Sequence, residues 1–224
     1  MRRSRHGNGQ QAEKAENSIQ DAISSGKRTG SLARLAVGVT LFVTCAPALA
    51  HDDTGLAGGF ANGFAHPLSG LDHMLAMVAV GLWGAFLGRP LIYALPMVFP
   101  IMMTVGGAVA MAGVPLPPVE VGIALSVVVL GGLIAGAVRA PVAVACGVVA
   151  LFALFHGFAH GTELPSAADP VGYSLGFVVA TGLLHVVGIA IGFISVLPRG
   201  TLALRGLGGG VFAAGTWFLY AAVA

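Results

Sequence analysis

The sequence predicts an all-α, polytopic membrane protein: a bundle of six transmembrane helices that follows a cleavable signal peptide. Of its 224 residues, 56% are hydrophobic and only 9% are charged, whereas a soluble domain carries about 25% charged residues. Glycine occurs 34 times, as in membrane helices that pack closely. Several apolar stretches also reach the roughly 20 residues that a helix needs to cross a bilayer.

Six stretches meet this length, and the connections between them are rich in proline, glycine and arginine, which favour turns. Residues 55–65 are also apolar but too short to cross, so we expect a short helix or a re-entrant piece packed against the bundle. The predicted spans cover residues 68–88, 91–112, 119–138, 141–161, 171–197 and 202–224.

The N-terminal region has the order of a secretory signal. Residues 1–34 are polar and basic, a short apolar run follows, and Ala48-Leu49-Ala50 provides the small residues of a cleavage site. We therefore predict that residues 1–50 are a signal peptide with an extended basic region. Residues 51–224 would then form the mature six-span transport domain, and an uncleaved signal anchor is the alternative.

Arginine placement predicts the orientation. Seven of the eleven basic residues lie in the first 34 positions. With the mature N-terminus in the periplasm, the other four fall in the three cytoplasmic connections, as the positive-inside rule requires. We expect an inner-membrane protein of a bacterium with both mature ends in the periplasm. These four residues are Arg89, Arg139, Arg199 and Arg205.

Composition also excludes several classes of protein. From residue 51 onward there are four basic and six acidic residues, so nothing suggests binding to nucleic acid. Cys45 and Cys146 are far apart and support neither a disulfide framework nor a cysteine metal site. There is no GxxxxGK[ST] phosphate-binding loop and no room for a separate ATP-hydrolysing domain.

Most of the histidines that follow residue 50 lie in two short motifs. The first is HPLSGLDH, from His66 to His73, at the periplasmic entrance of the first span. The second is FHGFAHGTE, from Phe155 to Glu163, at the periplasmic end of the fourth span. Because the fourth span runs outward, both motifs are expected at the same level of the membrane.

Helical spacing places the ligands of each motif together. His156 and His160 are four residues apart and Glu163 is three further on, so all three lie on one face of a helix. His66 and His73 are seven apart and share a face if the helix begins early enough. Two facing stripes would offer imidazole and carboxylate groups to one ion.

Asp72 adds a carboxylate about a quarter-turn from His73. Ionisable groups inside a membrane are costly and usually functional, and imidazole with carboxylate suits Ni, Co, Zn, Cu(II) or Fe(II). The structural alternative is that these side chains bond one another, for example through an Asp72–histidine hydrogen bond that pins two helices. The nearby Met97, Met102 and Met103 are interpreted as packing residues that do not share a face with the histidines.

Two further histidines are candidate metal ligands. His185 lies in the middle of the fifth span, with Thr181 and Ser174 on the same stripe, and is either a second site along a pathway or a structural hydrogen-bonding group. His51 would become the first residue of the mature chain, where its free amine and imidazole would chelate a metal jointly beside Asp52 and Asp53.

The two motifs resemble those of the HupE/UreJ family of nickel and cobalt permeases, which accompany nickel–iron hydrogenases and ureases. That family is marked by HX5DH in its first membrane helix and FHGX[AV]HGXE in a later one, and the resemblance covers about residues 51–224. It implies transported Ni²⁺ or Co²⁺, no tightly bound cofactor, and an indirect link to hydrogenase or urease maturation. It assigns to transport His66, Asp72, His73, His156, His160 and Glu163.

These observations favour a non-enzymatic permease that passes a divalent ion from periplasm to cytoplasm by facilitated diffusion. One alternative is a membrane-embedded zinc-dependent hydrolase with Glu163 as general base, although no HExxH is present. Another is a haem-bearing electron-transfer subunit, which the adjacent acids argue against. The expected partners are the metal ion and the lipid bilayer, with a homo-oligomer kept as an alternative to a monomer.

The topology is testable with reporter fusions. A fusion at Arg139 should report cytoplasm, and a fusion at Ala168 should report periplasm, because the arginines then lie in cytoplasmic connections. Paired alkaline phosphatase and green fluorescent protein fusions measure this directly. The opposite pattern would overturn the predicted orientation.

Overall fold

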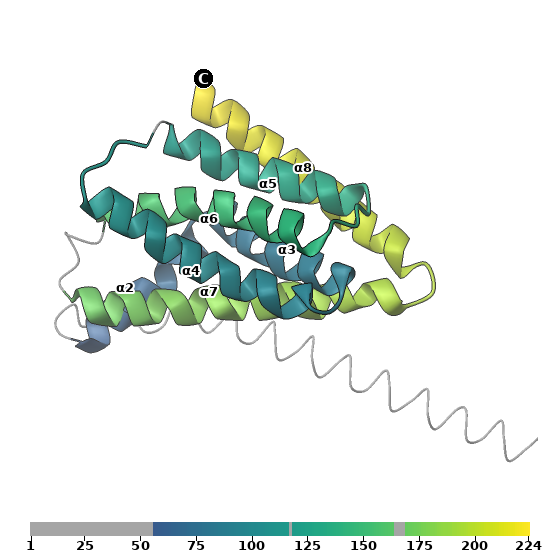
Figure 1. Ribbon diagram of the computed structural model, residues 1–224, viewed down its shortest axis with the longest axis horizontal. Coiled ribbons are helices and arrows are strands. Elements are labelled where there is room, and N and C mark those ends of the chain that lie inside the picture. Colours follow the sequence, from purple (N-terminus) through teal and green to yellow (C-terminus); the bar gives the residue numbers. More distant parts are fainter. Residues whose placement is uncertain (1–55, 117, 164–168) are drawn as a thin grey trace, which may run out of the picture. The chain divides into compact units, whose positions relative to one another are not determined.

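The structure, a computed structural model, describes residues 56–116, 118–163 and 169–224. All regular secondary structure in these ranges is helical, which confirms the predicted all-α class. The predicted signal peptide over residues 1–50 and His51 lie outside the described residues. Figure 1 shows the helices in chain order: α2 (Leu56–Ser69), α3 (Leu71–Leu87), α4 (Leu91–Met111), α5 (Val119–Ala135), α6 (Val142–Glu163), α7 (Pro170–Gly192), the 3-10 turn η3 (Phe193–Val196) and α8 (Gly200–Val223).

Four helices of the described chain are long and apolar enough to cross a membrane: α4, α6, α7 with η3, and α8. The helix pair α2–α3 passes the same test together, but it is bent by 83°. Helix α5 is apolar and has 17 residues, somewhat fewer than a membrane helix commonly needs. The multi-pass character is therefore confirmed, whereas the count of six spans stays a prediction.

The bend at Gly70 corrects the predicted first span. The helix that enters the bundle begins at Leu71 rather than at residue 68, because Gly70 has an extended backbone with φ −95° and ψ 109°. Before it, α2 ends at Ser69, whose hydroxyl donates a hydrogen bond to the carbonyl oxygen of His66. The short apolar segment predicted over residues 55–65 is thus a helix, α2.

The helices pair through glycine. A Cβ atom on Gly188 of α7 would fall on the backbone carbonyl of Val78 in α3, and one on Gly157 of α6 would fall on the backbone of Met103 in α4. Helices α5 and α8 are paired in the same way. Small residues at such crossings let backbones approach closely in a membrane, where apolar association alone drives little packing.

The arginines gather at one end of the helices. Arg205 Nε donates to the carbonyl oxygen of Ala135 at the end of α5, at 2.8 Å, and the Arg139 guanidinium lies 5.0 Å from the ring centroid of Phe86 near the end of α3. Arg89 closely follows α3. Arg205 lies within α8, not in the connection before it as the sequence predicted.

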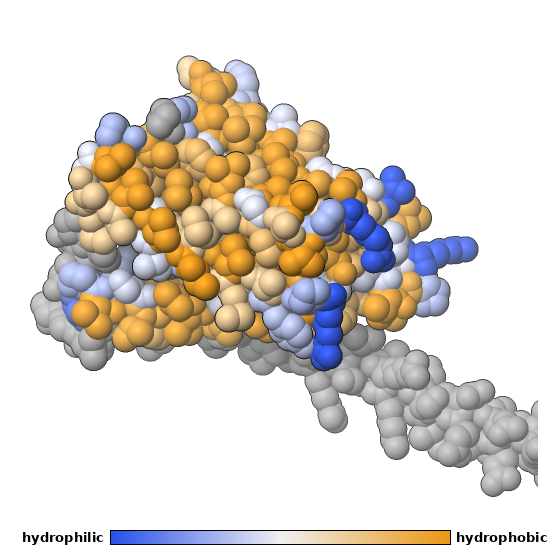
Figure 2. Space-filling view, viewed as in Figure 1, coloured by the Kyte–Doolittle hydropathy of each residue, from blue (hydrophilic) through white to orange (hydrophobic). Residues whose placement is uncertain are grey.

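Apolar side chains cover the outside of the bundle. The exposed large hydrophobic residues include Tyr93 of α4, Val186 of α7 and Trp217 of α8. Figure 2 shows apolar residues over most of the visible face and hydrophilic residues toward the ends of the helices. A surface of this kind suits lipid rather than water.

The glycine crossings lead to a stability prediction. Gly188→Ala should lower the free energy of unfolding by about 1–3 kcal/mol, because the new Cβ atom forces α3 and α7 apart. Gly182 lies on the same helix, but a Cβ atom added there would meet nothing within 4 Å. As a matched control, Gly182→Ala should be neutral or stabilising by up to about 1 kcal/mol. Thermal unfolding in detergent measures both, and equal effects would contradict the packing argument.

Candidate functional site

Four histidines from three helices form a continuous group of rings, here called the histidine cluster. His66 comes from α2, His73 from α3, and His156 and His160 from α6. The ring centroids lie 4.9 Å apart for His66 and His160, 4.8 Å for His73 and His160, and 4.9 Å for His73 and His156. The structure therefore brings together the imidazoles of both sequence motifs.

The route by which His66 joins the cluster differs from the predicted one. His66 and His73 were expected to share one helical face if the helix began early enough, but the 83° bend places them on two helices. Both rings nevertheless contact the ring of His160, His66 from α2 and His73 from the first turn of α3. A broken helix thus presents two imidazoles to α6 from different directions.

Hydrogen bonds orient two of the rings. His73 Nδ1 donates to the carboxylate of Asp72 at 2.9 Å, and His156 Nδ1 donates to the carbonyl oxygen of Phe152 at 2.9 Å. Because a carboxylate and a carbonyl oxygen only accept, the proton of each neutral ring lies on Nδ1. The Nε2 atoms of His73 and His156 then carry lone pairs, and both are buried with no hydrogen-bond partner among the described residues.

The glycines of the second motif have a packing role. Gly157, directly after His156, faces the backbone of Met103, and Gly161, directly after His160, faces Gly107. Each glycine allows α4 to approach α6 next to a histidine. Each His-Gly pair therefore combines a candidate ligand with the close helix contact that fixes its surroundings.

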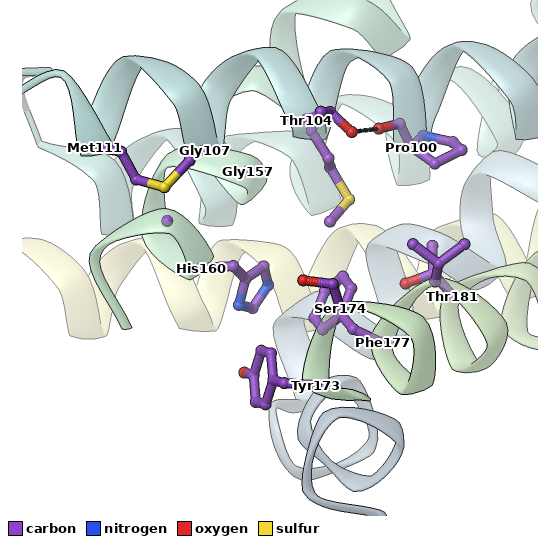
Figure 3. Close-up of a pocket in the computed structure, with 13 residues that line it drawn as sticks. Pro100, Thr104, Gly107, Met111, Gly157, His160, Tyr173, Ser174, Phe177 and Thr181 are labelled. Atoms are coloured by element: carbon purple, nitrogen blue, oxygen red, sulfur yellow. Dashed lines mark hydrogen bonds between the residues drawn. The ribbon is translucent and has the colours of Figure 1, made fainter. Parts of the chain in front are cut away.

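A cavity of about 290 Å³ adjoins the cluster between α4, α6 and α7. Figure 3 shows His160 and Phe177 on one side of it, with Thr104 and Met111 of α4 across from them. Met103 also borders the cavity. The methionines were interpreted as packing residues that do not share a face with the histidines, and this one borders the same cavity as His160.

Aromatic side chains of α7 and α4 surround the cluster, and sequence reasoning missed them. The Phe177 ring lies 4.4 Å from that of His160, and the Tyr173 ring lies 5.7 Å from that of His66. Their spacing on α7 could have revealed them. Tyr173 and Phe177 lie at intervals of four residues before Thr181 and His185, so all four share one face of the helix.

The remaining candidate ligands lie in different places. His185 is 1% exposed in the middle of α7, apart from the cluster. Glu163 ends α6, and its side chain lies outside the described part of the structure. Among the described residues, no three His, Cys, Asp or Glu side chains are already arranged to hold one metal ion. The cluster rings face one another edge to face, so a shared ion requires them to turn.

A multi-pass helical membrane protein with imidazoles buried inside the bundle is the class that this fold and site define. The HupE / UreJ protein family matches residues 39–218. Protein HupE of Rhizobium leguminosarum bv. viciae is 44% identical over 184 residues, which make up 82% of this chain and 96% of that protein. The chain belongs to the HupE/UreJ family, which is associated with nickel and cobalt transport. No solved structure matches it.

Asp72 offers a test of how the cluster is oriented. Replacing Asp72 by Asn removes the carboxylate that accepts the hydrogen bond from His73 Nδ1 and orients the ring, so metal affinity should fall about tenfold or more. Isothermal titration of the purified protein with Ni²⁺ measures the change. Thr216→Ala, at an exposed position of α8 outside the histidine cluster, is the control and should leave affinity unchanged. Equal affinities for both variants would argue against an orienting role.

Proposed function

We propose that this protein moves Ni²⁺ or Co²⁺ from the periplasm to the cytoplasm by facilitated diffusion. The observation that carries the proposal is the histidine cluster, in which two motifs far apart in the sequence meet through ring contacts. The cluster lies at the opposite end of α3 from Arg89. With arginines on the cytoplasmic side, the cluster faces the periplasm in an inner-membrane protein whose mature ends are both periplasmic.

The entrance carries negative charge. Glu120 lies in the first turn of α5 and Asp169 caps the start of α7, both at the cluster end of the bundle. Such acids raise the local concentration of a divalent cation. Glu163 and the predicted mature N-terminus, with His51 as an amine and imidazole ligand, would add to this entrance.

At the cluster, imidazole nitrogens replace part of the water shell of the ion. His73 and His156 have Nε2 lone pairs ready for this step, and His66 and His160 complete the set once the rings turn. Asp72 orients His73 and supplies a compensating negative charge. Because imidazole must be neutral to bind a metal, affinity falls as the pH falls.

The membrane potential supplies the driving force. A doubly charged ion that crosses an inside-negative membrane gains roughly 4.6 kcal/mol per 100 mV, twice the value for a single charge. Uptake therefore needs no ATP, provided that binding is loose enough for release. Metal delivered in this way would serve a nickel-dependent hydrogenase or urease, and the metal is cargo rather than a tightly bound cofactor.

Uptake into proteoliposomes tests this function. The wild-type protein should carry radiolabelled Ni²⁺ inward under an inside-negative potential, and His73→Ala or His160→Ala should reduce the rate at least about 100-fold by removing ligands at the entrance. Thr216→Ala, on the exposed face of α8, is the control and should transport normally. Circular dichroism and gel filtration confirm that each variant is folded.

Two results would overturn the proposal. One is a wild-type protein that carries neither Ni²⁺ nor Co²⁺ above empty liposomes. The other is a pair of histidine variants that transport normally but unfold at lower temperature, as expected if the cluster only pins the helices together.

A further inference from the structure

Phe99 of α4 stands between the histidine cluster and the deeper His185. Its ring centroid lies 5.4 Å from that of His156 and 5.2 Å from that of His185, with interplanar angles of 61° and 82°. The side chain is completely buried. An apolar ring therefore fills the space between the innermost imidazole of the cluster and the next imidazole along the bundle.

His185 lies well below the entrance. A Cβ atom on Gly81 of α3 would meet the carbonyl oxygen of His185, so Gly81 and His185 lie at the same depth in the bundle. Gly81 is eight residues along α3 from His73, which corresponds to about 12 Å at a rise of about 1.5 Å per residue. The three rings His156, Phe99 and His185 thus follow one another along the helix bundle.

His185 and Thr181 form a second polar position at this depth. Both ring nitrogens of His185 and the Thr181 hydroxyl are buried without a hydrogen-bond partner among the described residues. They are one helical turn apart on α7, and both are 1% exposed. Unpaired polar groups inside a membrane cost free energy, which argues that they serve a ligand rather than the fold.

Helix α4 is weakened on both sides of Phe99. Pro96 and Pro100 lie inside this helix, and each lacks the amide hydrogen that would bond to the carbonyl four residues before it. The carbonyls of Ile92 and Pro96 consequently lose their usual helical donor. The short segment that carries Phe99 is therefore the part of α4 least constrained by backbone hydrogen bonds.

We propose that Phe99 is an apolar gate between an entry station at the histidine cluster and an inner station at His185 and Thr181. The inference rests on the proposed transport function and extends it to the path inside the membrane. In the closed state the ring separates the stations. When the segment between the two prolines shifts, the ring turns aside and the ion passes from His156 to His185. An apolar constriction of this kind blocks a hydrated ion by excluding water.

Uptake rates test the gate. Phe99→Ala should raise Ni²⁺ uptake about tenfold and reduce discrimination against Mg²⁺, because the constriction is lost. Leu95→Ala is the matched control: Leu95 is buried one turn away on the same helix, so it removes similar apolar volume without opening the path. Pro100→Ala should restore a backbone hydrogen bond, raise thermal stability and slow uptake severalfold.

A second readout does not depend on transport. In protein lacking both native cysteines, Cys45 and Cys146, a His185→Cys variant reports access to the inner station. A membrane-impermeant thiol reagent added from the periplasmic side should modify it slowly when Phe99 is present. With Phe99→Ala the modification should be at least about tenfold faster, whereas Leu95→Ala should leave the rate unchanged.

The outcomes separate the gate from the transport function. If the wild-type protein carries no metal but cysteine modification is faster in Phe99→Ala, the transport function is refuted and the role of Phe99 as a barrier is still supported. Wild-type transport with equal uptake and equal modification in the Phe99→Ala and Leu95→Ala proteins refutes the gate. If Phe99→Ala does not fold, Phe99→Leu and Pro100→Ala carry the test, and unchanged uptake in both overturns the proposal.

Discussion

The close approach of paired helices at glycine determines where every described histidine of the site lies. Gly157 lets α4 reach α6 next to His156, and Gly81 lets α7 reach α3 at the level of His185. In a membrane the solvent does not drive apolar helices together as water does, so backbone contact and van der Waals packing must hold the pairs. The functional geometry therefore depends on residues that have no side chain.

A second constraint is the cost of polar groups in this apolar interior. His73 and His156 each satisfy Nδ1 within the fold, one through Asp72 and the other through the carbonyl of Phe152. The fold thereby sets which nitrogen is protonated and leaves both Nε2 atoms without a hydrogen-bond partner among the described residues. Local hydrogen bonds thus already hold the two rings in the orientation that the proposed metal binding needs.

The sequence predicted the class of fold and the meeting of the two motifs, because apolar length, arginine placement and histidine spacing are local signals. It did not predict the bend at Gly70, since Pro67 and Gly70 are compatible with either a continuous or a broken helix until α2 finds its packing partner. It also missed Phe99 and Phe177, which read as ordinary apolar residues in any membrane span. Their importance comes from neighbours on other helices, which no spacing along one helix reveals.

The edge-to-face contacts between the cluster rings bear on the affinity that the proposed carrier would have for its ion. Rings that contact one another edge to face must separate before they bind, and the lost contacts reduce the net affinity for the ion. A cluster arranged in advance would bind more tightly and release more slowly, which opposes conduction. In the proposed mechanism, a cation held loosely by the cluster above the Phe99 ring would meet a low barrier back to the periplasm and a higher barrier inward. Net movement would then depend on how often the segment around Phe99 opens.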